Sequence, residues 1–293
     1  MTSHSSPSSL TRTIFDAKNT DTLPGEKVRA EGVGPVADAA VNRVYDNLGV
    51  VHDFYSAVYG REALLRASPL EVTVRYGGEH MNDICWQEDQ LVIPEAGDGD
   101  PFGDLTLSLD LLAAEVTTRL VQHEVTLSAL GQAGALHYSI ADVFGSLVKQ
   151  YARKQSASQA DWLLGVEAFT TDVATDGKRS LKAPGAAFDD AFLGKDAQRA
   201  HMDDYEDTSD GDAGAFVNSG IPNHAFYLLA TKWGGNAWER AGKVWYTALT
   251  SRGLKEKSTF ADFARLTTTA AATLYGESES LVVKEAWSKV GVA

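Results

Sequence analysis

The dipeptide His123-Glu124, inside the stretch HEVTL, combines residue types that could hold and use a zinc ion. A zinc site on a helix needs two histidines four residues apart, with a glutamate beside the first as general base. In this chain the residue four positions after His123 is Leu127, which cannot bind a metal ion. The stretch is therefore either a degenerate zinc site or a chance match.

Two hydrophobic patterns predict the elements that position these residues. Before residue 105, alternating segments such as LEVTVRYG (70–77) and QLVIP (90–94) indicate strands separated by turns. Over 105–123 apolar residues recur at helical spacing, and later segments are helical in period, several ended by glycine. We therefore expect an α+β protein with a disordered segment over 1–10, a β-rich N-terminal domain over 11–123 and an α-helical C-terminal domain over 124–293.

Composition narrows the class of protein. The 293 residues are 44% hydrophobic, enough for a sizeable core, and the formal net charge is -14. This acidic balance argues against nucleic acid or an anionic membrane as a partner. A single cysteine, Cys85, excludes an intramolecular disulfide, and MTSHSSPSSL lacks the basic and apolar regions of a secretion signal. We therefore expect a cytoplasmic protein, while its oligomeric state stays unknown.

A series of segments along nearly the whole chain carries a resemblance to a known family. In order they include VYDNLGVVHDFYSAVYGRE, GDGDPFGDLTLSLDLLAAEVTT, GALHYSIADVFGSLVKQ and NSGIPNHAFYLLA. The series resembles the thermolysin-like zinc metallopeptidases, especially their protealysin-like branch. The resemblance implies a thermolysin-like fold, in which a β-rich N-terminal domain and a mainly α-helical C-terminal domain enclose a cleft with the zinc helix at its floor.

The same resemblance implies where the zinc ligands would lie. It places Ala114, Thr118 and Tyr138 at the three ligand positions and Glu115 at the general base, which leaves HEVTL two to three helical turns beyond the site. Zinc sites need three protein ligands of nitrogen, sulfur or carboxylate type, and these three residues supply no usable set. The resemblance therefore implies a degenerate member, a pseudo-peptidase without metal or cofactor that is inactive as a metalloendopeptidase.

Other positions of the cleft follow from the same resemblance. Phe216 stands where the family has its transition-state histidine, and Arg179 matches the arginine that binds the substrate carbonyl. Asn82 and Asp83 match the edge that binds the substrate backbone. The predicted substrate-binding residues are thus Asn82, Asp83, Thr118, Tyr138, Arg179 and Phe216. An alternative for Arg179 is a structural ion pair with Asp142.

Two functions remain open at this stage. Glu115 has apolar neighbours in the inferred cleft, so burial should raise the pKa of its carboxyl and suit it to proton transfer as the catalytic residue. The first hypothesis is metal-free acid/base catalysis on a small molecule or modified peptide, by cyclisation, isomerisation or elimination in a biosynthetic pathway. The alternative is a non-catalytic pseudo-peptidase that binds a peptide or protein partner. In both, the ligand occupies the interdomain cleft.

Overall fold

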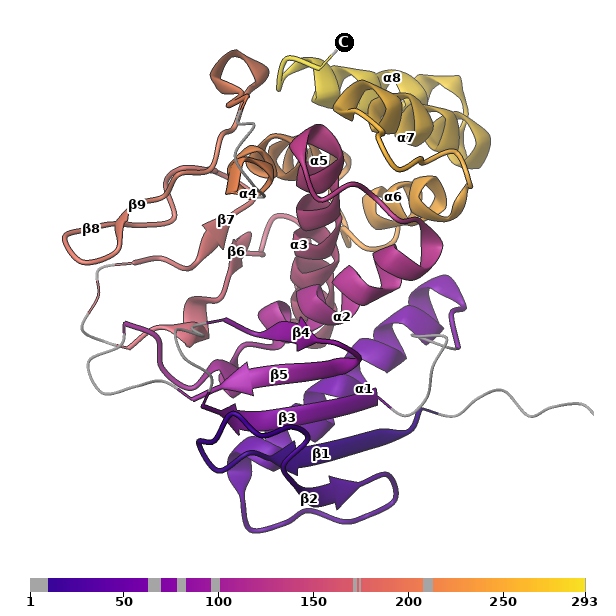
Figure 1. Cartoon of the computed structure of the whole chain (residues 1–293). Coiled ribbons are helices and arrows are strands. Elements are labelled where there is room, and N and C mark those ends of the chain that lie inside the picture. Colours follow the sequence, from indigo (N-terminus) through magenta and orange to yellow (C-terminus); the bar gives the residue numbers. More distant parts are fainter. Residues whose placement is uncertain are drawn as a thin grey trace, which may run out of the picture.

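The computed structural model describes residues 10–62, 70–77, 83–95, 101–170, 173, 175–207 and 213–292. The longer strands gather in the N-terminal part of the chain, and most helices follow them, which confirms the predicted α+β class. In Figure 1 the sheet lies at the bottom of the molecule and the last two helices, in yellow, lie at the opposite end.

The sheet of five strands combines parallel and antiparallel pairs. Its order is β2-β1-β3-β5-β4, and the strands are β1 (Arg12–Asp16), β2 (Glu26–Ala30), β3 (Leu70–Tyr76), β4 (Cys85–Gln87) and β5 (Gln90–Pro94). The pairs β1/β3 and β3/β5 are parallel, whereas β1/β2 and β4/β5 are antiparallel. The short strand β4 is therefore an edge, and its free side lies toward the helices.

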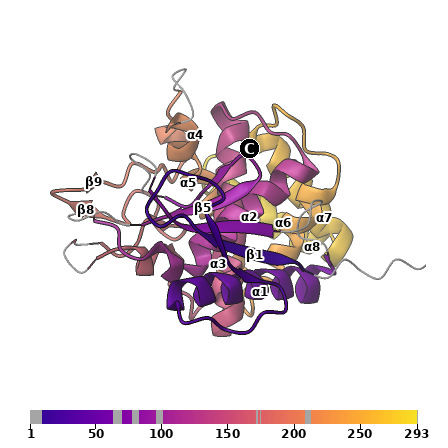
Figure 2. The same cartoon turned by 60° about the horizontal axis from the view of Figure 1, so that its bottom comes forward.

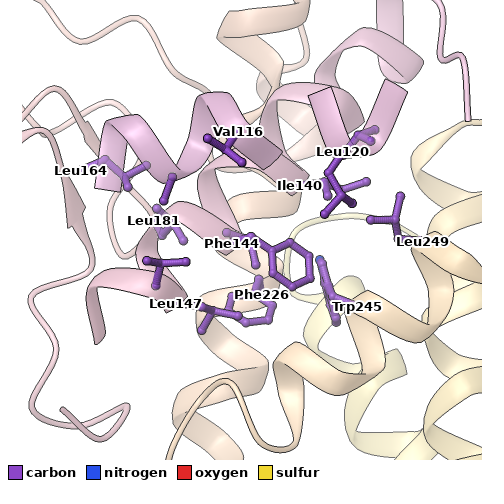
Figure 3. Close-up of a cluster of buried hydrophobic side chains, with 14 of the residues drawn as sticks. Val116, Leu120, Ile140, Phe144, Leu147, Leu164, Leu181, Phe226, Trp245 and Leu249 are labelled. Carbon is purple, nitrogen blue, oxygen red and sulfur yellow. The ribbon is translucent and has the colours of Figure 1, made fainter. Parts of the chain in front are cut away.

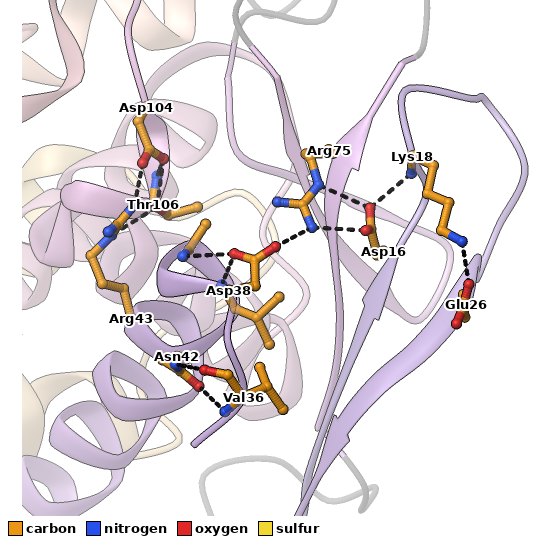
Figure 4. Close-up of polar contacts among 12 residues, drawn as sticks. Asp16, Lys18, Glu26, Val36, Asp38, Asn42, Arg43, Arg75, Asp104 and Thr106 are labelled. Carbon is orange, nitrogen blue, oxygen red and sulfur yellow. Dashed lines mark hydrogen bonds and ion pairs between the residues drawn. The ribbon is translucent and has the colours of Figure 1, made fainter.

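A helix of 21 residues, α1 (Ala39–Tyr59), interrupts the region predicted to hold only strands and turns. Its buried residues recur at helical spacing, and its ends carry clear signals: Asp38 caps the first backbone N–H groups, and Gly60 ends the helix in the left-handed conformation. Figure 4 shows that Arg75 of β3 bridges Asp16 of β1 and Asp38. This charge network joins the start of α1 to the sheet.

Two long helices form the centre of the molecule. A 3₁₀ turn over Leu105–Leu107 precedes α2 (Leu109–Glu124), so the predicted single helix over 105–123 begins four residues later than expected. The next helix, α3 (Gly131–Arg153), packs along α2. Figure 3 shows Val116 and Leu120 of α2 near Phe144 of α3, in a core that also includes Trp245.

The remaining elements surround this pair. Short strands and 3₁₀ turns follow α3: β6 (Leu163–Leu164), a turn over Val166–Ala168, β7 (Arg179–Ser180), β8 (Asp189–Asp190), β9 (Gly194–Lys195) and a turn over Met202–Asp204. The later helices are α4 (Ala213–Asn218), α5 (Gly220–Trp233), α6 (Ala241–Thr250), α7 (Phe260–Tyr275) and α8 (Glu277–Ser288). Within the described residues no helix combines the length and apolarity needed to cross a bilayer. In Figure 2 α1 lies along one face of the sheet.

Candidate functional site

Most of the residues singled out from the sequence meet in one pocket of about 200 Å³. Helices α2, α3 and α4 supply its walls, together with β7 and the segment before β4. The lining residues are Asp83, Leu111, Ala114, Glu115, Thr118, Tyr138, Ala141, Asp142, Arg179, Ala213 and Phe216. Asn82, also predicted to bind substrate, lies outside the described residues. The register that the resemblance implies is therefore consistent with the geometry.

Helical spacing explains how α2 contributes its part of the pocket. Its lining residues stand at intervals of three and four, so they share one face of the helix. Ala114 and Thr118 are one turn apart on this face, and Glu115 lies between them in sequence. The opposite face carries Val116 and Leu120 into the core. Amphipathic folding of α2 thus presents these three residues together.

The carboxyl of Glu115 has a raised pKa. The surrounding protein disfavours its charged form, and the nearby carboxylate of Asp83 adds repulsion, so the pKa of Glu115 rises to about 8. The side chain of Trp86 on β4 donates a hydrogen bond of 2.8 Å to the backbone oxygen of Glu115, which ties the edge strand to this turn of α2. At neutral pH Glu115 is therefore mostly protonated and can donate a hydrogen bond. The raised pKa predicted from the sequence is confirmed.

Arg179 and Asp142 form a buried ion pair at the pocket wall. The guanidinium donates to the carboxylate through Nε and Nη2 over 2.7 to 3.0 Å, and Asn223 donates to the same carboxylate over 3.0 Å. The predicted alternative of an internal pair is thus confirmed. The Nη1 atom of Arg179 has no hydrogen-bond partner among the described residues, and the side chain lines the pocket. Asp142 therefore orients an arginine that retains one free donor group.

A second ion pair lies beside the first. Lys178 donates to Asp83 over 2.6 Å, and the Asp83 side chain is 47% exposed. Backbone pairing of β6 with β7 holds this segment, with Arg179 opposite Leu164 in register. Sequence reasoning missed Lys178, although its neighbour Arg179 was identified. Alternation along an extended segment would have placed Lys178 on the side away from Arg179, so no signal in the sequence marked its pairing with Asp83.

Aromatic rings border the pocket next to Arg179. The rings of Tyr138 and Phe216 meet edge to face, with centroids 5.9 Å apart, and the Arg179 guanidinium lies 5.7 Å from the Phe216 centroid. Tyr138 is 37% exposed and Phe216 is partly buried. These rings give the pocket one apolar side.

The HEVTL segment lies apart from the pocket. His123 is in the last turn of α2, and Glu124, the helix's last residue, forms an ion pair of 2.7 Å with Arg61. Leu127 is buried in the core. None of the three lines the pocket. The expectation that this segment is a chance match therefore agrees with the geometry.

The residues present do not fit a catalytic zinc ion. Ala114 has no donor atom, and Thr118 and Tyr138 offer only neutral hydroxyl groups, which are not the usual zinc ligands. Across the part of the chain that the structure describes, no three His, Cys, Asp or Glu side chains are placed to hold a metal ion. These side chains therefore do not form the ligand set that a catalytic zinc ion requires.

A lysine occupies a deeply buried polar site near the start of α2. The ammonium of Lys149 on α3 lies 2.9 Å from Asp110 at the start of α2 and 3.1 Å from Asp161. It also donates to the backbone oxygen of Leu163. Lys149 and Asp110 are almost completely buried. Since a buried charge requires compensation, this pair links α3 to the start of α2.

Comparisons with known proteins support the resemblance. The family model for the thermolysin metallopeptidase α-helical domain matches residues 126–292. The extracellular metalloprotease of Pectobacterium carotovorum subsp. carotovorum is 42% identical, over 96% of this chain and 81% of that protein. Protease PrtS of Photorhabdus sp. (strain Az29) is 43% identical, over 97% of this chain and 76% of that protein.

A solved structure agrees with the same assignment. The precursor of protealysin, a metalloproteinase from Serratia proteamaculans, is 41% identical and superposes with a TM-score of 0.94, over 100% of this chain and 91% of that chain. The predicted thermolysin-like fold, with a sheet-rich N-terminal part and a helical C-terminal domain, is confirmed.

The comparisons overturn three predictions. The relatives are named as metalloproteases, so the predicted scaffold repurposed for cyclisation, isomerisation or elimination is wrong, as is its alternative of a non-catalytic pseudo-peptidase. The description of the protein as zinc-independent has no support from them either. The raised pKa of Glu115 does not by itself indicate a new reaction, because carboxyl groups with shifted pKa values also occur at purely structural positions. The cytoplasmic location is wrong because two relatives are named extracellular, and net charge and cysteine count do not decide a compartment.

Proposed function

Because the chain belongs to the thermolysin metallopeptidase family, we propose that it binds peptides in this pocket and that its zinc position is degenerate. The observation that carries the proposal is the set of residues around Glu115. Ala114 and Thr118 occupy one face of α2, and Tyr138 faces the same pocket from α3. The pocket thus retains polar groups for a peptide without a donor set for zinc.

Peptide recognition in the pocket depends on donors that are already oriented. Arg179 is positioned by Asp142, and its Nη1 group is free to bind a backbone carbonyl. A protonated Glu115 supplies a second donor near neutral pH. Positioned donors of this kind cost little conformational entropy when a ligand binds. Arg179 is therefore the substrate-binding residue, with Glu115 adjacent at the general-base position.

The degenerate zinc position predicts a metal content. After dialysis against excess zinc and then buffer, the purified protein should retain no stoichiometric zinc. The combined variant Ala114→His, Thr118→His and Tyr138→Glu should bind about one zinc per chain, because it creates three ligands of the required types.

Two controls make this measurement decisive. Circular dichroism shows whether the triple variant is folded, and adding Glu115→Gln to it should leave the zinc content unchanged. One tightly bound zinc per native chain would overturn the degenerate assignment. The proposed peptide binding is tested independently of the zinc position, by measuring whether the native protein binds peptides.

We also infer from the relatives named extracellular that this protein acts outside the cell. An immunoblot of culture medium and cell lysate from the source organism, with a cytoplasmic enzyme as marker, tests this. Detection only in the lysate fraction would contradict it.

A further inference from the structure

A groove between the last two helices shares no residue with the peptide pocket. Its volume is about 460 Å³, and α7 and α8 form its walls. Trp287 and Val292, which are almost fully buried, form its base. The Trp287 ring stacks on Trp245 with centroids 5.8 Å apart, so the base is held firmly. Because a cavity of about 150 Å³ can hold a benzene ring, the groove has room for an aromatic side chain and its neighbour.

The lining of the groove is basic, although the chain as a whole is acidic. Arg265 of α7 and Lys284 of α8 line it, and no Asp or Glu is among its described lining residues. The Arg265 side chain is 66% exposed and pairs with its helix neighbour Asp262. Lys284 is exposed and has no ion-pair partner within the described part of the chain. On a chain of formal net charge -14, these two cations favour an acidic occupant.

A hairpin formed by β8 and β9 presents an exposed aromatic ring. Phe192 at its tip is 71% exposed, more than any other large hydrophobic side chain that the structure describes. The Asp190 side chain accepts the backbone N–H groups of Phe192 over 2.7 Å and of Leu193 over 3.2 Å, which fixes the tip. Aromatic residues are enriched in protein interfaces, and a tip that is already ordered loses little entropy on binding. Phe192 therefore has the properties of an interface anchor.

The charge of this hairpin complements the charge of the groove. The segment over 189–195 contains two aspartates and one lysine, Lys195, which lies opposite Asp189 in the strand register. Asp189 is exposed. The tip therefore combines an apolar ring with a net negative charge, whereas the groove combines an apolar base with two cations.

The two surfaces lie too far apart to meet within one chain. Figures 1 and 2 both show the hairpin and the pair α7 and α8 on opposite sides of the molecule. A contact between them therefore joins two copies head to tail, and a pair of copies still has one free hairpin and one free groove.

We propose that the groove between α7 and α8 binds the hairpin of a second copy of this chain, with the Phe192 ring over Trp287 and Asp189 paired with Lys284. A hairpin tip buries a small area, so the association is weak and depends on protein concentration. None of these residues lines the peptide pocket, and the inference does not rest on peptide binding.

Sedimentation velocity over a range of protein concentrations tests the inference. The weight-average mass of the native protein should rise with concentration beyond that of a dimer, because each pair keeps a free hairpin and a free groove. Phe192→Ser should weaken the association at least about tenfold, as expected when an interface anchor is removed. Leu130→Ser removes another exposed apolar side chain, outside both surfaces, and should leave the association unchanged.

A reversal of charge tests the pairing of the two surfaces. Lys284→Glu should weaken the association because it places like charges together, and Asp189→Lys should do the same. Both changes in one chain should restore the association, because the pair is then reversed. Lys257→Glu makes the same change of charge at an exposed lysine outside the groove and should have no effect. Far-ultraviolet circular dichroism of each variant shows that folding is retained.

Three results would contradict this inference. A native protein that stays monomeric at every concentration would overturn it, and so would an association that survives Phe192→Ser. Failure of the double variant to restore the association lost in Lys284→Glu would overturn the pairing of Asp189 with Lys284.

Discussion

At the residue scale, the surroundings of Glu115 link the site to the stability of the fold. Its pKa is raised from 4.5 to about 8, so between these values the folded protein binds more protons than the unfolded chain. A raised carboxyl pKa means that the free energy of unfolding falls as pH increases from about 4.5 to 8. This loss of stability is absent at lower pH, where Glu115 is protonated in both the folded and the unfolded protein.

Replacing this carboxyl should therefore stabilise the protein only at higher pH. We expect Glu115→Gln to be more stable than the native protein by roughly 2 to 4 kcal/mol at pH 8, with the difference shrinking toward zero at pH 4.5. Urea denaturation of both proteins across this range measures it. Glu256→Gln, at an exposed position, is the control for the substitution itself. A pH-independent difference would mean that Glu115 is not shielded as described.

At the element scale, the crossing of α2 and α3 determines where the pocket residues lie. Gly145 of α3 faces α2 so closely that a Cβ atom there would lie 2.5 Å from the backbone oxygen of Asp110 and 3.0 Å from the Cβ of Ala114. The helices can approach this far only because position 145 has no side chain. Glu115 and Asp142 thereby face a common pocket.

Gly145→Ala should consequently destabilise the protein although alanine favours helices. Intrinsic propensity alone would stabilise by up to about 1 kcal/mol, whereas overpacking of this kind costs roughly 1–3 kcal/mol. We expect a net loss in urea denaturation. Gly49→Ala in α1 is the matched control, since its new Cβ would meet the guanidinium of Arg12 but no backbone atom, and should cost less. Unchanged or increased stability of Gly145→Ala would contradict the close crossing.

At the scale of the whole molecule, the N-terminal half, which contains the sheet and α1, shares one hydrophobic core with the helical C-terminal half. Tyr55 of α1 stacks on Phe144 of α3 with ring centroids 5.8 Å apart, and its hydroxyl bonds Thr117 of α2 over 2.8 Å. Buried residues form one continuous cluster that includes both Ile14 and Val292. The pocket depends on this union, because Asp83 comes from the N-terminal half and Arg179 from the C-terminal half.

A cavity in the N-terminal half should therefore weaken the C-terminal half as well. Leu48→Ala empties a fully buried position of α1 and should cost roughly 2–5 kcal/mol. The denaturation midpoints by far-ultraviolet circular dichroism and by tryptophan fluorescence should fall together. Five of the six tryptophans, all except Trp86, lie in the C-terminal part, so fluorescence reports mainly on it. Val33→Ala, at an exposed site, should leave both in place. A fluorescence midpoint unaffected by Leu48→Ala would show independent halves.

The sequence by itself determined the hydrophobic periodicity of individual strands and helices, and which positions of the chain correspond to the site. Alternation identified β3 and β5, and the family resemblance located Glu115 and Arg179, because both signals depend only on neighbouring residues and spacing. Strand and turn signals dominated the N-terminal region and concealed α1, although Asp38 and Gly60 mark its ends.

Only the tertiary structure decided how the charges combine. Asp83 meets Lys178 from 95 positions away, and Arg179 meets Asp142 from 37. Pairs so distant in sequence leave no periodic pattern, because their contact depends on where whole elements pack. The acidity of Glu115 follows from the same packing, since burial and the Asp83 charge act through space rather than along the chain.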